Sequence, residues 1–342
     1  MDQVTIKDVA REAEVSPSTV SRVISDSSQI SCKTKEKVRT VMDKLGYHPN
    51  AIARSLVNQR CNSIGLVMSR PTDRALANPF FTDIIQGIAA ATQQENFSLM
   101  LTSADSYESE TRDALNLVKK RQVEGLILMA SRLSGDLINT LVRENYPFVL
   151  VGRSREHSQI PRVDNNNIGA VKDAVKELIA RGYSNIAFLS GPQDYVVCQD
   201  RLQGYREAMV EAGLAYRPEL VSYAEFSYEA GFKEARNLFA RYRQKIDLIF
   251  GADDLLALGA LRAAEARGWR VPEDIGVIGF NDTPAASLVN PGLTTIRIPI
   301  KEMGKRAARM LISIIEDHNY QGEEVIIPTE IIWRNSVRDE NF

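Results

Sequence analysis

The segment "VSPSTVSRVI", Val15–Ile24, predicts a short helix with two different faces. Ser16 is a favoured helix N-cap, and Pro17 suits the first helical position. Val20 and Val23 then fall on the face that packs against a core. The opposite face is polar and solvated, and packing alone does not explain its side chains: Ser18, Ser21 and Arg22.

Two further helices are expected beside this one. Residues Ile6–Ala13 show helical apolar spacing behind a possible cap at Thr5, and a third helix runs from about Cys32 to Leu45, where Gly46 suits the C-terminal stop. The three-residue turn "EVS" joins the first two helices, as in a helix-turn-helix. In that motif the second helix enters the major groove of DNA, and its N-terminal side chains meet base edges.

This motif gives the polar face a function. An arginine can donate two hydrogen bonds to guanine and a serine can donate or accept, so the side chains expected to read bases are Pro17, Ser18 and Arg22. Phosphate contacts orient a protein on DNA without specifying sequence, and the side chains better placed for them are Ser16, Thr19 and Ser21.

The segment "HPNAIARSLVNQR", His48–Arg60, leaves two alternatives open. Asn50 can cap a helix over residues 51–58, which is too short to be stable alone and leaves apolar side chains such as Ala53 and Leu56 with little cover. The segment is either a plain linker with some helical character or a hinge that folds against a dimer mate on DNA. In the second case Leu56 wedges into a minor-groove step and kinks it.

Length, charge and cysteine content restrict the class of protein. The 342 residues allow two or three domains, and no apolar run reaches membrane-spanning length. The N-terminus "MDQVTIKDVA" does not resemble a signal peptide, and the three cysteines have no zinc or redox spacing, so we expect a reduced cytoplasmic protein without metal, cofactor or membrane contact. Residues 1–60 carry ten basic and seven acidic side chains, against 32 and 37 in the rest, so only this head is expected to meet a polyanion.

From Ser63 onward, apolar runs typical of buried strands alternate with helical patterns. A first series reads "IGLVM", "LMLTSA", "GLILMA" and "PFVLVG", with helices near 79–95, 109–122 and 134–145. A second series reads "NIAFLSG", "LVSYAE", "DLIFGAD" and "IGVIGFND", with helices near 168–181, 199–212, 228–244 and 254–267. This alternation predicts parallel sheets with right-handed crossovers, arranged as two lobes.

Ligands of such folds bind in the crevice at the carboxyl ends of the strands. Aromatic and charged side chains that suit a polyhydroxylated ring follow the predicted strands: Phe80, Phe81, Asp105, Arg153, Asp164, Asn165, Asp200, Arg201, Phe226, Asp253, Asp254, Asn281 and Asp282. Taken singly, each is better explained as a core or capping residue, as are Asn78 and Asn167. Together, at successive strand ends, they favour a binding site.

Two other classes share parts of this pattern. A sugar-binding transport component has a similar body but carries a signal peptide and no basic head. A dehydrogenase needs a glycine fingerprint after its first strand, and "IGLVMSRPTDR" has none. The sequence also contains no Walker motif and no GxSxG elbow, so nothing supports an enzyme.

The segments "TIKDVAREAEVSPSTVSRVI" and "TKEKVRTVMDKLGYHPNAIARSL", with the body that follows, resemble the LacI/GalR family of bacterial transcription regulators. The resemblance implies an α/β fold, with a three-helix helix-turn-helix head (1–48), a hinge helix (49–61) and a two-lobed, periplasmic-binding-protein-like core of type I with parallel sheets (62–342). It implies that lobe one spans about 62–163 and 293–321, and lobe two about 164–292 and 322–342. "TTIRIP" and the helix Lys301–Asp317 would then rejoin lobe one, and "EVIIPTEIIWR" lobe two.

The resemblance also implies site residues. Those expected to bind DNA are Thr5, Ser16, Pro17, Ser18, Thr19, Ser21, Arg22, Tyr47, Asn50, Ala53 and Leu56. Those expected to bind an effector are Phe80, Phe81, Asp105, Arg153, Asp164, Arg201, Phe226, Asp253, Asn281 and Asp282. Arg201 and the pair in "GFND" match effector positions of the family. Asp253-Asp254 stands where the family often has Asn-Asp, which changes the polarity of the hydrogen bonds on offer.

The expected function is that of a homodimeric repressor that binds double-stranded operator DNA and answers to a small sugar between its lobes. Four segments, "VSPSTVSRVI", "NPFFTDIIQGI", "IPRVDNNN" and "DRLQGY", most resemble regulators of maltose or related α-glucoside operons. A transport component without a DNA role, or a regulator that answers to a nucleobase, is the alternative. No heptad pattern follows "EVIIPTEIIWR", so a dimer is expected rather than a tetramer.

Overall fold

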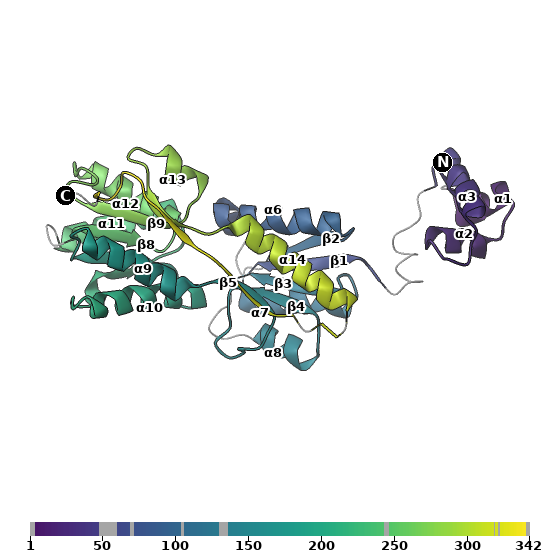
Figure 1. Cartoon of the computed structure of the whole chain (residues 1–342), viewed down its shortest axis with the longest axis horizontal. Coiled ribbons are helices and arrows are strands. Elements are labelled where there is room, and N and C mark those ends of the chain that lie inside the picture. Colours follow the sequence, from purple (N-terminus) through teal and green to yellow (C-terminus); the bar gives the residue numbers. More distant parts are fainter. Residues whose placement is uncertain are drawn as a thin grey trace. The chain divides into compact units, whose positions relative to one another are not determined.

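The computed structural model describes residues 4–47, 60–68, 72–103, 106–129, 136–242, 246–317, 319–320 and 322–339. The chain divides into two compact units, Met1–Asn62 and Ser63–Phe342, which are described separately below (Figure 1). No helix among these residues has the length and apolar character needed to cross a membrane.

The described part of the N-terminal unit, residues 4–47 and 60–62, contains three helices: α1 (Ile6–Glu12), α2 (Pro17–Ile24) and α3 (Cys32–Leu45). Each begins at the cap that the sequence predicts. Thr5 and Asp8 form a capping box, and the hydroxyls of Ser16 and Ser31 accept the backbone N–H three residues on. Gly46 ends α3 with φ 62°, a left-handed conformation that glycine adopts without strain. The core of this unit is small and apolar, and centres on Val9, Ala13, Val20, Val23 and Val38.

The helix-turn-helix prediction is therefore confirmed, from caps to core. The predicted hinge, residues 49–61, lies almost entirely outside the described residues, and so do Asn50, Ala53 and Leu56.

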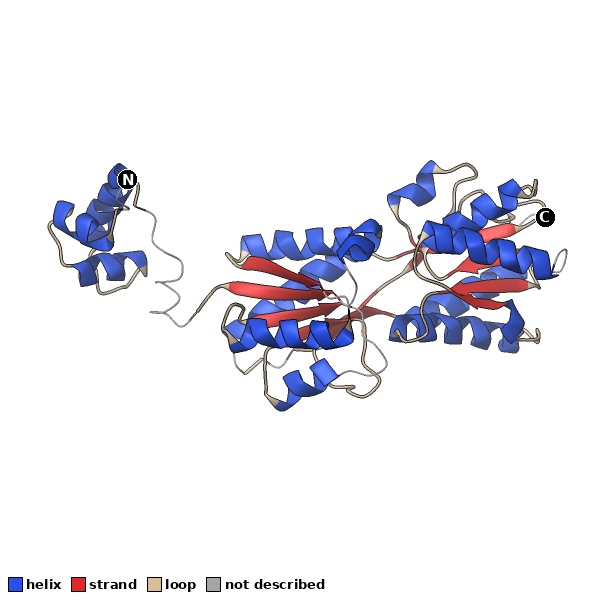
Figure 2. Cartoon of the chain, turned by 180° about the vertical axis from the view of Figure 1, so that it is seen from behind, coloured by secondary structure: helices blue, strands red, loops and turns tan. Residues whose placement is uncertain are grey.

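The second unit holds two six-stranded sheets, each with helices on both faces (Figure 2). Lobe one contains the sheet ordered β11-β5-β4-β3-β1-β2, made of β1 (Ser63–Met68), β2 (Ser98–Ser103), β3 (Gly125–Met129), β4 (Phe148–Val151), β5 (Arg162–Asn165) and β11 (Glu324–Ile327). Its helices are α5 (Thr72–Ala77), α6 (Pro79–Gln94), α7 (Tyr107–Lys119), α8 (Asp136–Arg143) and α14 (Ile300–Glu316). Helices α6 and α14 pack together on one face, and α7 and α8 lie on the other (Figure 1).

Lobe two contains the sheet ordered β12-β10-β9-β8-β6-β7, made of β6 (Ile186–Ser190), β7 (Val221–Tyr223), β8 (Leu248–Gly251), β9 (Gly276–Asn281), β10 (Thr294–Arg297) and β12 (Glu330–Ile332). Its helices are α9 (Asn167–Ala180), α10 (Val196–Glu211), a 3₁₀ turn (Pro218–Leu220), α11 (Tyr228–Tyr242), α12 (Asp254–Ala266) and α13 (Pro284–Leu288). Helices α9 and α10 cover one face, and α11 and α12 the other (Figure 1). The predicted α/β fold with two lobes is confirmed.

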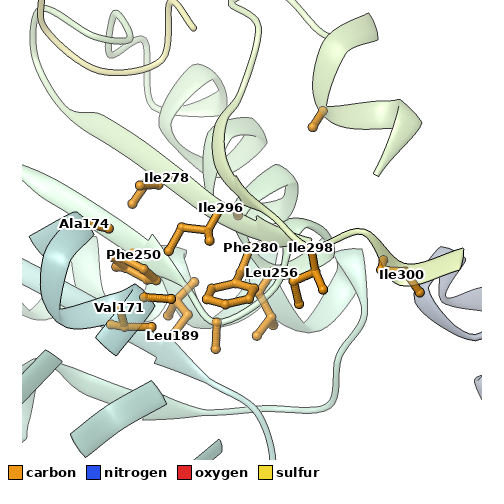
Figure 3. Packing of buried hydrophobic residues seen from close by; sticks show 14 of the residues in the cluster. Val171, Ala174, Leu189, Phe250, Leu256, Ile278, Phe280, Ile296, Ile298 and Ile300 are labelled. Carbon is orange, nitrogen blue, oxygen red and sulfur yellow. The ribbon is translucent and has the colours of Figure 1, made fainter. Parts of the chain in front are cut away.

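Strands covered on both faces are buried along their whole length, which explains the continuous apolar runs in the sequence. All residues of β3, β6, β8 and β9 are buried. In lobe two the apolar core gathers around Phe250 and Phe280 and continues along Ile298 and Ile300 toward α14 (Figure 3). This core holds the strand ends in place where the chain crosses between the lobes.

The last passages of the chain between the lobes differ from the prediction, which had placed lobe boundaries at 293 and 322. Strand β10 pairs in parallel with β9, so "TTIRIP" belongs to lobe two, although α14 lies in lobe one as expected. Hydrogen bonds of β10 accompany this placement. The Thr294 N–H donates to the Ser336 hydroxyl and the Thr295 hydroxyl donates to the Asp254 carboxylate, and both partners lie outside lobe one.

The segment "EVIIPTEIIWR" was also assigned wrongly as a whole. Its first half is β11, which pairs in parallel with β5 in lobe one, and its second half is β12, which runs antiparallel to β10 in lobe two. Pro328 separates them, because proline cannot donate to a strand ladder. Likewise β5 extends to Asn165, so Asp164 belongs to lobe one and not to lobe two.

Candidate functional site

The exposed face of α2 is built as a DNA-reading surface requires. Ser16, Pro17, Ser18 and Arg22 are exposed, whereas Val20 and Val23 on the opposite face are buried. No described residue forms a hydrogen bond or ion pair with the Arg22 guanidinium, so its five N–H groups are available to a partner.

The other predicted DNA residues of this unit have structural roles as well. The Ser16 hydroxyl lies 2.8 Å from that of Ser18 and 2.9 Å from that of Thr19, while it also caps the helix. Thr5 is exposed and caps α1, and Tyr47 packs against the edge of the small core. Their proposed contacts with DNA therefore come from side chains that the fold already positions.

Arg22→Ala is expected to reduce discrimination between operator and random DNA by about 5- to 150-fold, because one bidentate arginine–guanine contact contributes about 1–3 kcal/mol. The measurement is the ratio of the two dissociation constants at fixed salt, since phosphate contacts depend on salt. Arg39→Ala is the matched control, because Arg39 is exposed in the same unit but pairs with Asp26. An unchanged ratio in the Arg22 variant would show that Arg22 does not read bases.

In the second unit, a cavity lies between the lobes at the carboxyl ends of the strands, where parallel folds bind ligands. The cavity volume is about 70 Å³, and the cavity is partly open to solvent. Its walls come from the ends of β4 and β5, from the first turns of α6, α9 and α10, and from α14: Phe80, Val151, Gly152, Arg153, Asp164, Asn165, Asn167, Val196, Val197, Asp200, Arg201 and Met303. We refer to it as the cleft cavity.

Arg201 is a buried charge in the wall of the cleft cavity, with 5% of its surface exposed. Its Nε donates to Asn167 Oδ1 over 2.9 Å, its Nη1 donates to the carbonyl of Ala252, and its guanidinium carbon lies 3.6 Å from the centre of the Phe280 ring. Burial lowers the pKa of Arg201 to about 10, so the side chain stays charged at neutral pH. Among the described residues no carboxylate forms an ion pair with Arg201. Its charge is stabilised by a backbone carbonyl, a side-chain amide oxygen and the face of an aromatic ring.

Asp164 lies on the opposite side of the same wall, at the end of β5. Its Oδ1 accepts hydrogen bonds from the backbone of Asn165 over 2.8 Å and from Asn167 Nδ2 over 3.3 Å. Burial, with a smaller contribution from the nearby Asp200 carboxylate, raises the pKa of Asp164 to about 6. The carboxylate is therefore the charged form at neutral pH and can accept hydrogen bonds from a ligand.

An ion pair and an amide–carboxylate hydrogen bond are among the side-chain contacts that join the lobes across the cleft. Arg153, just after β4 in lobe one, donates from Nε and Nη2 to the two carboxylate oxygens of Asp200 in α10 of lobe two, over 2.6 and 2.5 Å. Asn78, before α6 in lobe one, donates to Asp253, before α12 in lobe two, over 3.0 Å. The two lobes are thus held together by the protein's own side chains.

The second contact explains the departure from the family's Asn-Asp pattern. Asp253 accepts the Leu256 N–H with Oδ1 to cap α12, and accepts the Asn78 amide with Oδ2. An asparagine has only one acceptor oxygen and could not do both. Asp254 does not cap the helix, as one alternative had it; it is fully buried and accepts from Thr283 and Thr295 over 2.6 Å each.

Of the predicted effector residues, the cavity wall includes Phe80, Arg153, Asp164 and Arg201. Phe81 instead packs in the core of lobe one, edge-on to Phe80, and Asp282 is bound by Arg297 and Arg334 over 2.7 and 2.6 Å. The wall does not include three others: Phe226, Asn281 and Asp253. Asp105 lies outside the described residues.

The prediction passed over Asn167 as a helix cap, although Asn166 is the cap of α9. It named Asp200 among the candidates at the strand ends but not among the expected effector-binding residues. A signal for Asp200 was present in the sequence, since an acidic residue precedes the buried Arg201 and can meet a basic residue at a strand end.

Comparison with known proteins identifies matches to both parts of the chain. Residues 5–50 match the bacterial regulatory proteins of the lacI family, and residues 175–337 match a periplasmic binding protein-like domain. The HTH-type transcriptional regulator CelR of Thermobifida fusca is 36% identical over 334 residues, which cover 97% of this chain and 98% of CelR. The HTH-type transcriptional repressor PurR of Vibrio campbellii is 33% identical over 338 residues, with coverage of 98% and 99%.

Two solved structures extend the comparison. A complex of the transcriptional regulator CelR with cellobiose is 34% identical, covers 98% of this chain and 100% of its own, and superposes with a TM-score of 0.76. A lac repressor dimer bound to operator and an anti-inducer is 28% identical, covers 98% and 99%, and superposes with a TM-score of 0.87. The chain, with its helix-turn-helix head and two-lobed body, belongs to the LacI family of bacterial transcriptional regulators.

Proposed function

We propose that this regulator represses a carbohydrate-utilisation operon and that an uncharged sugar in the cleft cavity controls its affinity for operator DNA. The observation that carries the proposal is the balance of charge in the cavity wall. Two guanidinium groups, Arg153 and Arg201, face two carboxylates, Asp164 and Asp200, so a ligand needs no charge of its own. Hydroxyl groups both donate and accept, and Phe80 offers an aromatic face to a sugar ring.

The proposed effector is maltose or a related α-glucoside. Four segments of the sequence resemble regulators of such operons, and CelR, a relative over the whole length, was solved with cellobiose. Both sugars are disaccharides of glucose and differ in the linkage, so cellobiose is the closest competitor to test. A nucleobase is the remaining alternative, because PurR is also similar over the whole length.

The test is an operator selected from random-sequence DNA, followed by titration with maltose, cellobiose or adenine. We expect maltose to change operator affinity by about 5- to 150-fold, which is the usual range of coupling between two sites. A response to adenine alone would contradict the sugar proposal. A response to cellobiose alone would keep the sugar class and correct the linkage.

We also propose that the functional form is a homodimer, as in the lac repressor dimer bound to operator. A two-fold dimer presents two copies of α2 to two operator half-sites, which matches the geometry of helix-turn-helix binding. Sedimentation at micromolar concentration is expected to give a dimer. A stable tetramer, or a monomer throughout this range, is the result that would contradict it.

A further inference from the structure

Asn165 is an unpaired amide in the wall of the cleft cavity. It ends β5, lines the cavity and is 5% exposed, yet its Nδ2 has no hydrogen-bond partner among the described residues. Its neighbour Asn167 is also 5% exposed and is fully engaged. Asn167 Nδ2 donates to Asp164 and to the carbonyl of Asn165, both over 3.3 Å, and its Oδ1 accepts from Arg201.

The backbone fixes where this amide lies. Asn165 is paired with Ile327 in the ladder between β5 and β11, and its N–H donates to Asp164 Oδ1 over 2.8 Å. The backbone of Asn165 is therefore held at the cavity wall by a strand pair. A buried donor without a partner destabilises a fold, and most buried polar groups have a partner. The unpaired amide thus has a cost that the folded chain alone does not offset.

A second group in the cavity wall has a free acceptor oxygen. Asp164 uses its Oδ1 for two protein donors, whereas its Oδ2 accepts no hydrogen bond from any residue that the structure describes. An amide donor and a carboxylate acceptor in the wall of one cavity can bond two hydroxyl groups of one ligand, one as acceptor and one as donor. Such a pair of hydroxyls is a constant feature of sugars.

We propose that Asn165 is a specificity-determining residue of the effector site, whose Nδ2 donates a hydrogen bond to a ligand hydroxyl while Asp164 accepts one from a second hydroxyl. This rests on the proposed function and deepens it by stating what the ligand must carry: one hydroxyl group that accepts from Asn165 and one that donates to Asp164. Occupation of the site satisfies the amide, and a ligand without an acceptor at this place leaves it unpaired.

The experiment compares Asn165→Leu and Asn165→Ala with the matched control Asn167→Ala, all in the full-length chain. Without ligand, the Asn165 variants are expected to melt at or above the wild-type temperature, because an unpaired donor is removed. Asn167→Ala is expected to melt lower by at least about 2 °C, because three partners lose a bond. With maltose, the Asn165 variants are expected to bind about tenfold more weakly than wild type by calorimetry, the loss of one hydrogen bond.

Two results would overturn the inference. One is a fall in the melting temperature of both Asn165 variants as large as that of Asn167→Ala, which would show that the amide has a partner in the unliganded protein. The other is wild-type affinity for maltose or cellobiose in both Asn165 variants. If the wild type binds neither sugar, the proposed effector is wrong, and the melting comparison, which needs no ligand, still decides whether the amide is unpaired.

Discussion

Replacing Arg201 by alanine is expected to abolish sugar binding while operator affinity stays close to that of the wild type. The substitution removes the buried guanidinium over Phe280 and leaves Asn167 Oδ1 and the Ala252 carbonyl without their donor. Hydrogen bonds to a charged group contribute about 1.5–3 kcal/mol each, so the loss of two ligand bonds weakens binding at least about 100-fold. The helix-turn-helix core includes none of these residues, so the DNA-reading helix keeps its structure.

The measurement is a pair of titrations, sugar by calorimetry and operator by fluorescence anisotropy. Arg270→Ala is the control, since Arg270 is an exposed arginine of lobe two that pairs only with Asp274. Arg201→Lys keeps the charge but has one nitrogen, so it cannot serve both protein acceptors and should bind sugar with intermediate affinity. Wild-type sugar affinity in Arg201→Ala would place the effector elsewhere.

Leu56→Ala provides the opposite test. Leu56 lies outside the described residues, and the expectation comes from the sequence, in which a short helix has too few hydrogen bonds to be stable alone. If Leu56 wedges into the minor groove, the variant loses operator affinity and keeps sugar affinity. Normal operator binding by this variant would make the segment a passive linker.

The elements that the sequence predicted well are those fixed by local signals. Ser16, Ser31 and Gly46 act on the backbone within a few residues of themselves, so the limits of α2 and α3 can be read directly. Apolar runs that alternate with helical patterns likewise identify the strands and the helices of the two lobes. The lobe to which β10 and β11 belong depends on the distant strand with which each pairs. For β10, hydrogen bonds to Ser336 and Asp254, which are distant in the chain, accompany that pairing, and no local pattern predicts it.

The same limit applies to the cleft. Polar residues at strand ends include ligand contacts, helix caps and ion pairs, and the sequence does not separate them. Asp282 illustrates this, because its partners Arg297 and Arg334 lie 15 and 52 residues away in the chain. Asn165 shows the converse, since only the absence of a protein partner, seen in three dimensions, distinguishes it from Asn167.

The ion pair between Arg153 and Asp200 is expected to respond unequally to the loss of each partner. The Asp200 side chain is 2% exposed and that of Arg153 is 33% exposed. Arg153→Met leaves the buried Asp200 carboxylate with Arg155, 3.6 Å away, as an ion-pair partner. A buried charge left without any partner destabilises by about 3–5 kcal/mol, so the cost expected here lies below that range. Asp200→Asn leaves an arginine that can turn toward water, so its cost should be far smaller, and the double variant should recover much of the stability lost in Arg153→Met.

Loss of Arg153 is also expected to favour an open cleft, because opening exposes the Asp200 carboxylate to water. Unliganded Arg153→Met is therefore expected to populate the open arrangement, seen as a longer distance between spin labels at the exposed positions Ser313 in α14 and Ala266 in α12. Asn78→Ala, which removes a neutral donor from another contact between the lobes together with the N-cap of α6, should lengthen this distance less. Equal distances in all these proteins would show that the pair does not hold the cleft closed.

If the ion pair already closes the cleft in the unliganded protein, effector binding changes the proportion of closed molecules by a smaller amount. Since an effector shifts an equilibrium only by its differential affinity for the two arrangements, Arg153→Met should also widen the gap in operator affinity between sugar-free and sugar-bound protein.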